Sequence, residues 1–257
     1  MKTPFEIRYN NIKLKVERLY KSAAQPGEER FPGLEDISFT LKGGECVHLH
    51  SNVPSANRLL LDALSGHIRI DAGAIWVDHQ GRWLNLPQLS HRQIDQIQAR
   101  TIGYLGQSET LRRESTVLDC VSRQLLELGL TRTQAEAQSR HVLDWVGLAR
   151  RLWHQAPKHL TLNELHQVNL ARTFAIDYSV IVIDGSINRL EPENQERLIT
   201  LIEYRKAQDT CFIGRFDQDD LRQQICERHL SIHVPTYIPK DIPPIHAVAN
   251  NIAAHSY

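Results

Sequence analysis

The sequence has no excess of charge of either sign. Lys and Arg together count 30, and Asp and Glu together also count 30, so the formal net charge is zero. A surface that binds nucleic acid or anionic lipid normally requires a basic excess. The composition therefore excludes a broad electrostatic surface of this kind, and we expect no nucleic-acid partner.

The sequence also lacks long hydrophobic runs and paired cysteines. No apolar run approaches the roughly 20 residues needed to cross a bilayer, and the N-terminal residues do not have the pattern of a secretory signal peptide. The four cysteines (Cys46, Cys120, Cys211 and Cys226) are far apart in the sequence and form no C-x-x-C pair. Such cysteines are typical of reduced thiols, so we expect a cytoplasmic protein without direct membrane insertion.

Histidine is abundant, but it lacks the spacing of a metal site. The chain has 13 histidines and no His-x-x-x-His pair with acidic support on a predicted helix. His48 and His50 alternate along one predicted strand, which favours packed or solvated side chains over ligands. With 41% hydrophobic residues, the chain can form a sizeable core.

Apolar periodicity predicts strands that alternate with helices. The predicted strands cover residues 5–20, 34–41, 45–50, 74–77, 83–86, 180–184, 210–214 and 230–234. The predicted helices cover residues 56–65, 117–128, 133–146, 163–176, 192–206 and 219–228. This alternation indicates a parallel sheet, and residues 108–160 form a helical insertion within it. Residues 1–234 are expected to form one domain. The Pro-rich tail, 235–257, is either a loose terminus or an arm that docks on a partner.

One predicted strand has the pattern of a nucleotide hydrolase without its catalytic residue. The apolar run of residues 180–183 ends in Asp184, and an Asp at this place holds Mg²⁺ in such enzymes. The next residue is Gly185, which has no side chain to polarise water. The pattern therefore predicts a hydrolase fold from which the chemistry has been removed.

Three short segments resemble one known family. They are Gly44-Glu45-Cys46-Val47, the string Arg151-Leu152-Trp153-His154 with Ala156-Pro157, and Val168-Asn169-Leu170-Ala171-Arg172. Over about residues 5–234 the chain resembles an ABC-type ATPase domain, and within that family it is most similar to the PhnL-like subunits of the carbon–phosphorus lyase (phosphonate) system.

The resemblance implies an α/β fold like that of P-loop NTPases, with an antiparallel β subdomain and a helical subdomain. It implies ATP and Mg²⁺ as cofactors. It also implies a protein partner, either carbon–phosphorus lyase components or another ABC subunit in a homo- or heterodimer.

The segment that corresponds to the phosphate loop has lost the residues that bind phosphate. In the pattern G-x-x-x-x-G-K-[ST], glycines let backbone N–H groups approach phosphate, Lys offsets its charge and the hydroxyl holds Mg²⁺. Here Ser51 and Ala56 replace the glycines, Asn57 replaces the lysine and Arg58 replaces the hydroxyl residue. Pro54 removes a further backbone donor. We therefore expect a vestigial nucleotide site.

The family signature sequence, which contacts the nucleotide of an opposite subunit, is also altered. It corresponds to residues 160–164, where Thr161 keeps a hydroxyl and Leu162 and Asn163 replace glycines. The same residues allow another interpretation, which we prefer. In this interpretation Thr161 caps a helix and Glu164 completes a capping box.

At the other family positions, two catalytic residues are replaced and three binding residues are kept. Gly185 stands where the family has its catalytic Glu, and Asp217 stands where it has the switch His. Asp184 remains at the position for Mg²⁺. Gln107 matches the glutamine at the hinge to the helical subdomain, and Tyr20 matches an aromatic residue that stacks on adenine.

Together, the residues favour a catalytically inactive, PhnL-like ABC subunit with a structural or regulatory role. We expect residues 108–160 to contact its partner. One alternative is a nucleotide enzyme with a rewired site, in which Asp184, Gln107, Tyr20 and Arg58 bind the ligand. Another alternative is a degenerate nucleotide-binding subunit of an ABC transporter.

Overall fold

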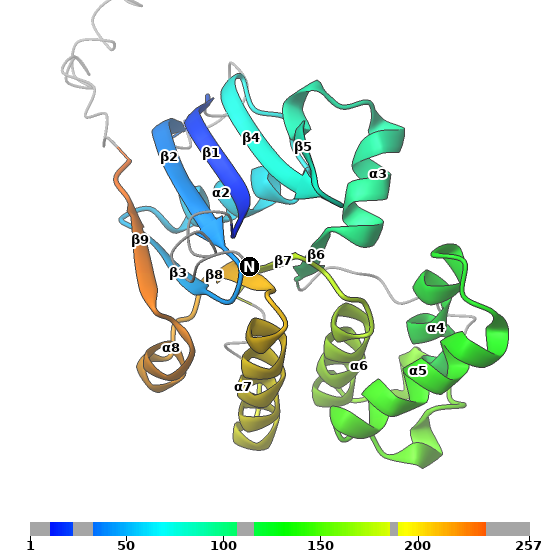
Figure 1. Cartoon of the computed structure of the whole chain (residues 1–257). Helices are drawn as coiled ribbons and strands as arrows, with labels where there is room; N and C mark the ends of the chain where they lie inside the picture. Colours follow the sequence, from blue (N-terminus) through cyan, green and yellow to red (C-terminus); the bar gives the residue numbers. More distant parts are fainter. Residues whose placement is uncertain (1–10, 23–32, 107–115, 186–189, 235–257) are drawn as a thin grey trace, which may run out of the picture.

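The structure is a computed structural model, and it describes residues 11–22, 33–106, 116–185 and 190–234. Two β-sheets organise these residues (Figure 1). The antiparallel sheet has the strand order β2-β1-β4-β5. Its strands are β1 (Ile12–Lys21), β2 (Leu34–Lys42), β4 (Ala72–His79) and β5 (Arg82–Asn85).

The second sheet is entirely parallel and has the strand order β6-β7-β8-β3-β9. Its strands are β3 (Cys46–Ser51), β6 (Ile102–Leu105), β7 (Val180–Ile183), β8 (Cys211–Gly214) and β9 (Arg228–Ile232). Both faces of this sheet are covered, which explains the continuous apolar run of β7.

Helices connect the strands and cover the sheets. The α-helices are α2 (Pro54–Leu64), α3 (His91–Arg100), α4 (Val117–Glu127), α5 (Arg132–Trp145), α6 (Leu162–Phe174), α7 (Pro192–Ala207) and α8 (Asp219–Ile225). Three short 3₁₀ turns cover Leu86–Gln88, Arg150–Leu152 and Pro157–His159. In Figure 1, α6, α7 and α8 lie on the side of the parallel sheet away from the antiparallel sheet, and α4 and α5 form a separate pair beside α6.

Strand β7 separates two hydrophobic cores. Val180 and Val182 belong to the core that contains α2 and the antiparallel sheet. Ile181 and Ile183 belong to the core that contains α4 to α8. Successive side chains of a strand point to opposite faces, so one short strand contributes to both cores and places its C-terminal end between them.

The hairpin of β4 and β5 depends on its turn. Gln80 and Gly81 both have positive φ values, of 54° and 81°. Two such residues produce a turn whose twist matches that of the paired strands, and glycine adopts this conformation without strain. The predicted strands on either side of Gly81 are therefore confirmed.

Two elements were not predicted and one predicted helix was too long. The sequence gives no clear sign of α3 or β6, because α3 buries only Ile97 and β6 has four residues with a glycine among them. The predicted helix 219–228 was too long. Cys226 is already extended, with φ −103° and ψ 123°, and the Glu227 N–H donates to the Cys46 carbonyl at 3.1 Å. Hydrogen bonding to β3 thus ends α8 and starts β9.

Candidate functional site

The segment from Ser51 to Arg58 lies at the C-terminal end of β3 and runs into α2, where the phosphate loop was predicted. Ser51 closes β3, and its Oγ accepts a hydrogen bond from the Val53 N–H at 3.1 Å. Helix α2 begins at Pro54 and has no side-chain cap. Because proline lacks an N–H, this helix end offers fewer donors to an anion than an ordinary helix does.

Asn57, predicted at the lysine position, is buried inside α2. Its residue surface is only 5% exposed, and its Oδ1 has no hydrogen-bond partner among the described residues. An unpaired buried amide oxygen costs about 1–3 kcal/mol. The amide is neutral and has no positive charge to offset that of a phosphate. The side chain at this position therefore cannot replace a lysine in that role.

Arg58, predicted at the hydroxyl position, extends into solvent. Its side chain is 68% exposed, and its Nε lies 3.6 Å from the Asp62 carboxylate one helical turn away. An exposed pair at this distance contributes less than about 1 kcal/mol. Arg58 has a positive charge available at the surface, but it has no hydroxyl to hold Mg²⁺.

Asp184 lies directly after β7, as predicted. Its carboxylate contacts the hydroxyl of Tyr104 and not a side chain of the 51–58 segment. The Tyr104 Oη is 3.4 Å from the Asp184 carboxylate and 3.3 Å from the Asp62 carboxylate. Burial and these two negative charges raise the pKa of Tyr104 above its usual value. The phenol therefore keeps its proton and links the end of β7 to α2.

The other predicted catalytic positions lie in different surroundings. Gly185 follows Asp184 and contributes no side chain. Asp217 accepts two hydrogen bonds from the Arg215 guanidinium, at 2.9 and 2.7 Å. Tyr20 is 42% exposed on β1, and Gln107 lies outside the described residues. The structure thus brings together Asp184, Tyr104, Asp62 and Arg58, of which Tyr104 and Asp62 were not predicted.

His48 lies beside the predicted switch position. It is buried on β3, and its Nδ1 accepts from the Phe216 N–H at 3.3 Å. Burial lowers the pKa of His48 to about 4, and the positive charges of Arg222, His229 and His50 act in the same direction. The imidazole is therefore neutral at physiological pH and serves as a hydrogen-bond acceptor.

This shift predicts a pH dependence of stability. Between pH about 6.5 and 4 the unfolded chain binds a proton on His48 that the folded chain excludes, so the free energy of unfolding falls as the pH is lowered. The expected loss over this window is about 2 kcal/mol. Urea denaturation at several pH values measures it, with His48→Gln as the variant that cannot titrate. An equal pH slope in both proteins would contradict the prediction.

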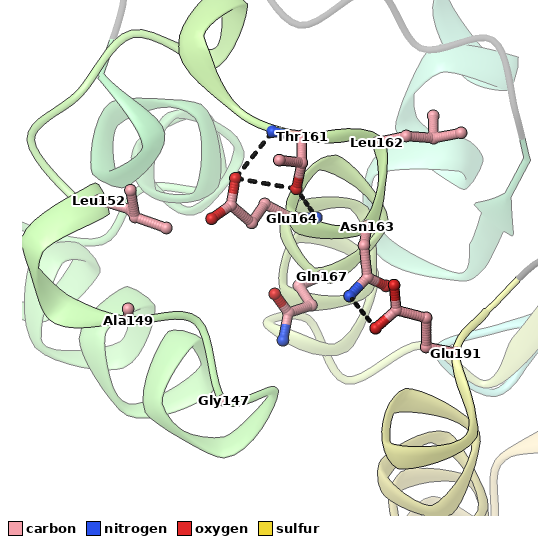
Figure 2. Close-up of a pocket in the computed structure, with 9 residues that line it drawn as sticks. All are labelled: Gly147, Ala149, Leu152, Thr161, Leu162, Asn163, Glu164, Gln167 and Glu191. Carbon is pink, nitrogen blue, oxygen red and sulfur yellow. Dashed lines mark hydrogen bonds between the residues drawn. The ribbon is translucent and has the colours of Figure 1, made fainter.

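The predicted signature segment forms the wall of an open pocket of about 520 Å³ (Figure 2). The Thr161 Oγ1 accepts from the Glu164 N–H at 3.3 Å, and the Glu164 carboxylate accepts from the Thr161 N–H at 2.7 Å. Thr161 and Glu164 therefore form a capping box at the start of α6. The preferred interpretation of these residues as a helix cap is confirmed.

Side chains of the protein also engage the remaining polar groups of this segment. Asn163 donates to the Glu191 carboxylate at 3.0 Å and accepts from the Asn194 amide at 2.7 Å. Gln167 donates to the Val146 carbonyl at 3.0 Å and to the Asn194 Oδ1 at 3.2 Å. Figure 2 shows Asn163 directed at Glu191, whereas Leu162, which is 65% exposed, points away from this network. The Asn163 and Gln167 side chains are therefore engaged within the protein.

These positions do not fit Mg-ATP as the family binds it. The structure provides neither a lysine nor a hydroxyl at residues 57 and 58, and Gly185 and Asp217 supply neither a carboxylate nor an imidazole for water orientation. Within the described ranges, no group of three or more His, Cys, Asp or Glu side chains is placed to hold a metal ion.

The two sheets, the segment between β3 and α2, and the helical pair beside α6 define an ATP-binding-cassette domain. The model of the ABC transporter family matches residues 34–188. This is more than half of the chain, and the chain belongs to that family. The predicted fold class is thereby confirmed.

Relatives of known type agree with this assignment. The lipoprotein-releasing system ATP-binding protein LolD of Chromohalobacter salexigens is 28% identical over 202 residues, which cover 79% of this chain and 83% of the relative. LolD 2 of Caulobacter vibrioides is 31% identical over 177 residues, which cover 69% of this chain and 74% of the relative.

Solved structures share the fold. An ATP-binding cassette in a dimeric post-hydrolysis state, bound to ADP and Pi, superposes with a TM-score of 0.76 at 17% identity, covering 86% of this chain and 96% of that one. CbiO1 of Clostridium perfringens, part of an ABC transporter complex, gives a TM-score of 0.69 at 18% identity, covering 88% of both chains.

Proposed function

We propose that this chain is an ABC-family subunit that acts through its folded surface and does not hydrolyse ATP. Its proposed setting is a PhnL-like role in phosphonate use, with carbon–phosphorus lyase components or another ABC subunit as partner, in the cytoplasm. The phosphonate setting is supported by the sequence string from Arg151 to Pro157 alone, because the relatives reported above are LolD proteins.

The observation that carries the proposal is the burial of Asn57 at the lysine position. Charge neutralisation of the transferred phosphate is the main contribution of a protein to phosphoryl transfer. Here the Asn57 side chain is neutral and buried, and the Asp184 carboxylate accepts a hydrogen bond from the Tyr104 hydroxyl. Binding energy directed at phosphate is therefore missing, while the packing of both cores is intact.

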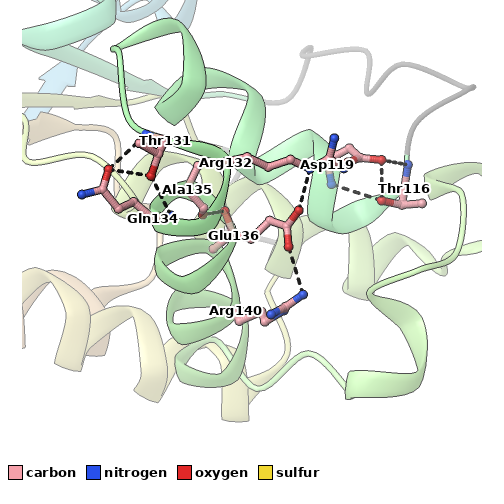
Figure 3. A network of polar contacts seen from close by, with 9 residues as sticks. Thr116, Asp119, Thr131, Arg132, Gln134, Ala135, Glu136 and Arg140 are labelled. Carbon is pink, nitrogen blue, oxygen red and sulfur yellow. Dashed lines mark hydrogen bonds and ion pairs between the residues drawn. The ribbon is translucent and has the colours of Figure 1, made fainter.

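The helical subdomain is the surface that we propose for the partner. Figure 3 shows its polar side chains, with capping boxes at Thr116 and Thr131 and a row of ion pairs along α5. Glu136 pairs with Arg132 at 2.9 Å and with Arg140 at 3.1 Å. A surface of this kind contributes electrostatic specificity more than apolar affinity.

Calorimetry with ATP and ADP, in the presence and absence of Mg²⁺, tests the proposal. We expect no binding by the purified chain at millimolar nucleotide. Micromolar binding would show that the 51–58 segment still holds phosphate, and nucleotide would then act as a ligand and a possible switch. Hydrolysis by the purified chain or by its complex would overturn the proposal.

Restoration of the phosphate loop gives a sharper prediction. The triple variant Ala56→Gly, Asn57→Lys, Arg58→Ser is expected to fold and to show no ATPase activity, because Gly185 and Asp217 are unchanged. A coupled assay of phosphate release measures this, and circular dichroism verifies folding. Strong activity in the triple variant would show that other residues compensate for both losses.

A nucleotide enzyme with a rewired site is the alternative of a different class. Arg58 supplies an exposed positive charge and Asp184 a carboxylate, and Tyr20 and Gln107 complete that proposal. Saturable ATPase activity that disappears in Asp184→Asn would favour this alternative. Its absence from the purified protein and from the complex would exclude it.

The third candidate is a degenerate nucleotide-binding subunit of an ABC transporter, and the similarity to LolD favours it. None of the helices in the described ranges is long and apolar enough to span a bilayer. Co-purification with a membrane protein would support this candidate, and purely soluble partners would count against it.

A further inference from the structure

Two cysteines that are 180 residues apart in the sequence meet in the fold. The Cys46 Sγ, at the start of β3, lies 3.4 Å from the Cys226 Sγ, directly after α8. Both residues are free thiols. The sequence analysis treated them as unrelated, since only the parallel pairing of β3 with β9 brings them together.

The backbone around the pair is fixed by several hydrogen bonds. The Cys46 N–H donates to the Glu227 carboxylate at 2.8 Å, and the Glu227 N–H donates to the Cys46 carbonyl at 3.1 Å. Lys206 donates to the Ile225 carbonyl at 3.2 Å and forms an ion pair with Glu227. The two thiols are thus held together by the native contacts before any bond forms between them.

The two thiols differ in access. Cys46 is fully buried, whereas Cys226 is partly exposed. Burial and the neighbouring Cys226 raise the pKa of Cys46 well above its usual value. A reagent from solution therefore reaches Cys226 first, and Cys46 reacts only with a sulfur that is already beside it. A partly exposed thiol can attack a disulfide from solution, and a second thiol beside it can then resolve the mixed disulfide.

We propose that Cys46 and Cys226 form a reversible thiol–disulfide switch that a small-molecule disulfide, such as glutathione disulfide, oxidises. The Cys226 thiolate attacks one sulfur of the disulfide, a mixed disulfide forms, and one thiolate leaves. Cys46 then loses its proton to that thiolate and attacks the Cys226 sulfur, which releases the second thiolate. The protein loses two electrons and two protons, and the small disulfide is reduced to two thiols.

The disulfide would join the start of β3, the strand that runs into the 51–58 segment, to the residue that follows α8. An S–S bond of about 2.0 Å requires the sulfurs to approach by more than 1 Å from their present separation. Cys226 is the C-cap of α8, and its N–H donates to the Arg222 carbonyl at 3.0 Å. Rotation of the two cysteine side chains can bring the sulfurs together while this backbone hydrogen bond is kept. The crosslink would fix the start of β3 to the end of α8.

The test treats the full-length chain with glutathione disulfide under native conditions, then counts thiols in denaturant and maps peptides by mass spectrometry. We expect wild type to lose the thiols of Cys46 and Cys226 and to yield one peptide that joins the two residues. Cys46→Ser should stop with one glutathionyl group on Cys226, and Cys226→Ser should leave Cys46 unreacted. Cys120→Ser, which removes the other partly exposed cysteine, should yield the same crosslinked peptide as wild type.

The oxidised protein should melt roughly 5–10 °C above the reduced protein, and dithiothreitol should reverse the difference. Retention of all four thiols by wild type would overturn the proposal. A stable mixed disulfide without the crosslink, or a crosslink that forms only in denaturant, would overturn it as well.

Discussion

Replacement of Trp153 by alanine is expected to lower the free energy of unfolding by about 3–5 kcal/mol. The indole is buried in the core of the helical subdomain, and its Nε1 donates to the Leu148 carbonyl at 3.0 Å. The Trp153 carbonyl accepts from the Leu118 N–H at 2.9 Å and thus satisfies the start of α4. Loss of the ring leaves a cavity beside a helix end that depends on this segment.

Urea denaturation followed by circular dichroism measures the effect, since fluorescence would change with the tryptophan itself. Trp83→Ala is the matched control. Trp83 is 47% exposed on β5, and its replacement should cost less than about 1 kcal/mol. Trp153→Phe keeps most of the ring and loses the N–H donor, so an intermediate loss of about 1–2 kcal/mol is expected. Equal losses in Trp153→Ala and Trp83→Ala would contradict the prediction.

The result bears on the proposed phosphonate role. Trp153 is part of the string on which the similarity to PhnL-like chains rests, and the carbonyl of Gln155 accepts from the Val117 N–H at 3.0 Å. The string therefore connects to α4 and supports the helical subdomain. A large loss of stability in Trp153→Ala would show that the string has a structural role, whatever partner this subdomain contacts.

The second large effect is expected at Arg205, a buried cation on α7. Its guanidinium donates to the Phe174 carbonyl at 2.6 Å and to the Ile176 carbonyl at 3.3 Å, at the end of α6. Its ion pair with Asp177 adds little, because the Asp177 side chain is 84% exposed. Arg205→Met would remove the guanidinium donor from the Phe174 carbonyl, whereas the Ile176 carbonyl would keep the Tyr178 N–H at 3.1 Å. A buried acceptor without its donor costs about 1–3 kcal/mol, and we expect a loss in this range.

Urea denaturation also measures this loss, and Arg132→Ala is its control. Arg132 forms an exposed i,i+4 pair with Glu136, and its replacement should cost about 0.5 kcal/mol. A loss below 1 kcal/mol in Arg205→Met would indicate that water replaces the guanidinium at the end of α6.

The sequence was sufficient to predict those helices and strands in which the buried residues recur at a regular spacing. Strands such as β7 and helices such as α4 and α5 were predicted close to their observed bounds, because each has a clear apolar face. Helix α3 and strand β6 were missed since neither carries such a pattern. The end of α8 is decided by hydrogen bonds between Glu227 and Cys46 of β3, and no local signal in the sequence indicates a partner that is 181 residues away.

The candidate site likewise has features that could be predicted from the sequence and features that could not. The sequence located the segment 51–58, Asp184 and the cap at Thr161, since each lies at the end of a predictable element. It did not reveal Tyr104 between Asp62 and Asp184, or the contacts of Asn163 with Glu191 and Asn194. These contacts depend on side chains from separate elements, and their geometry exists only after the two cores have formed.

The amide of Asn52 pairs with the backbone of Val234 in both directions, with both hydrogen bonds at 3.0 Å. The backbone that follows β9 is thereby joined to the segment at which phosphate binding was predicted. A fluorophore or affinity tag attached shortly after residue 234 would begin its path beside that segment. Labels near this point are therefore suited to report on a ligand there, whereas a tag that must leave the segment undisturbed is better attached elsewhere.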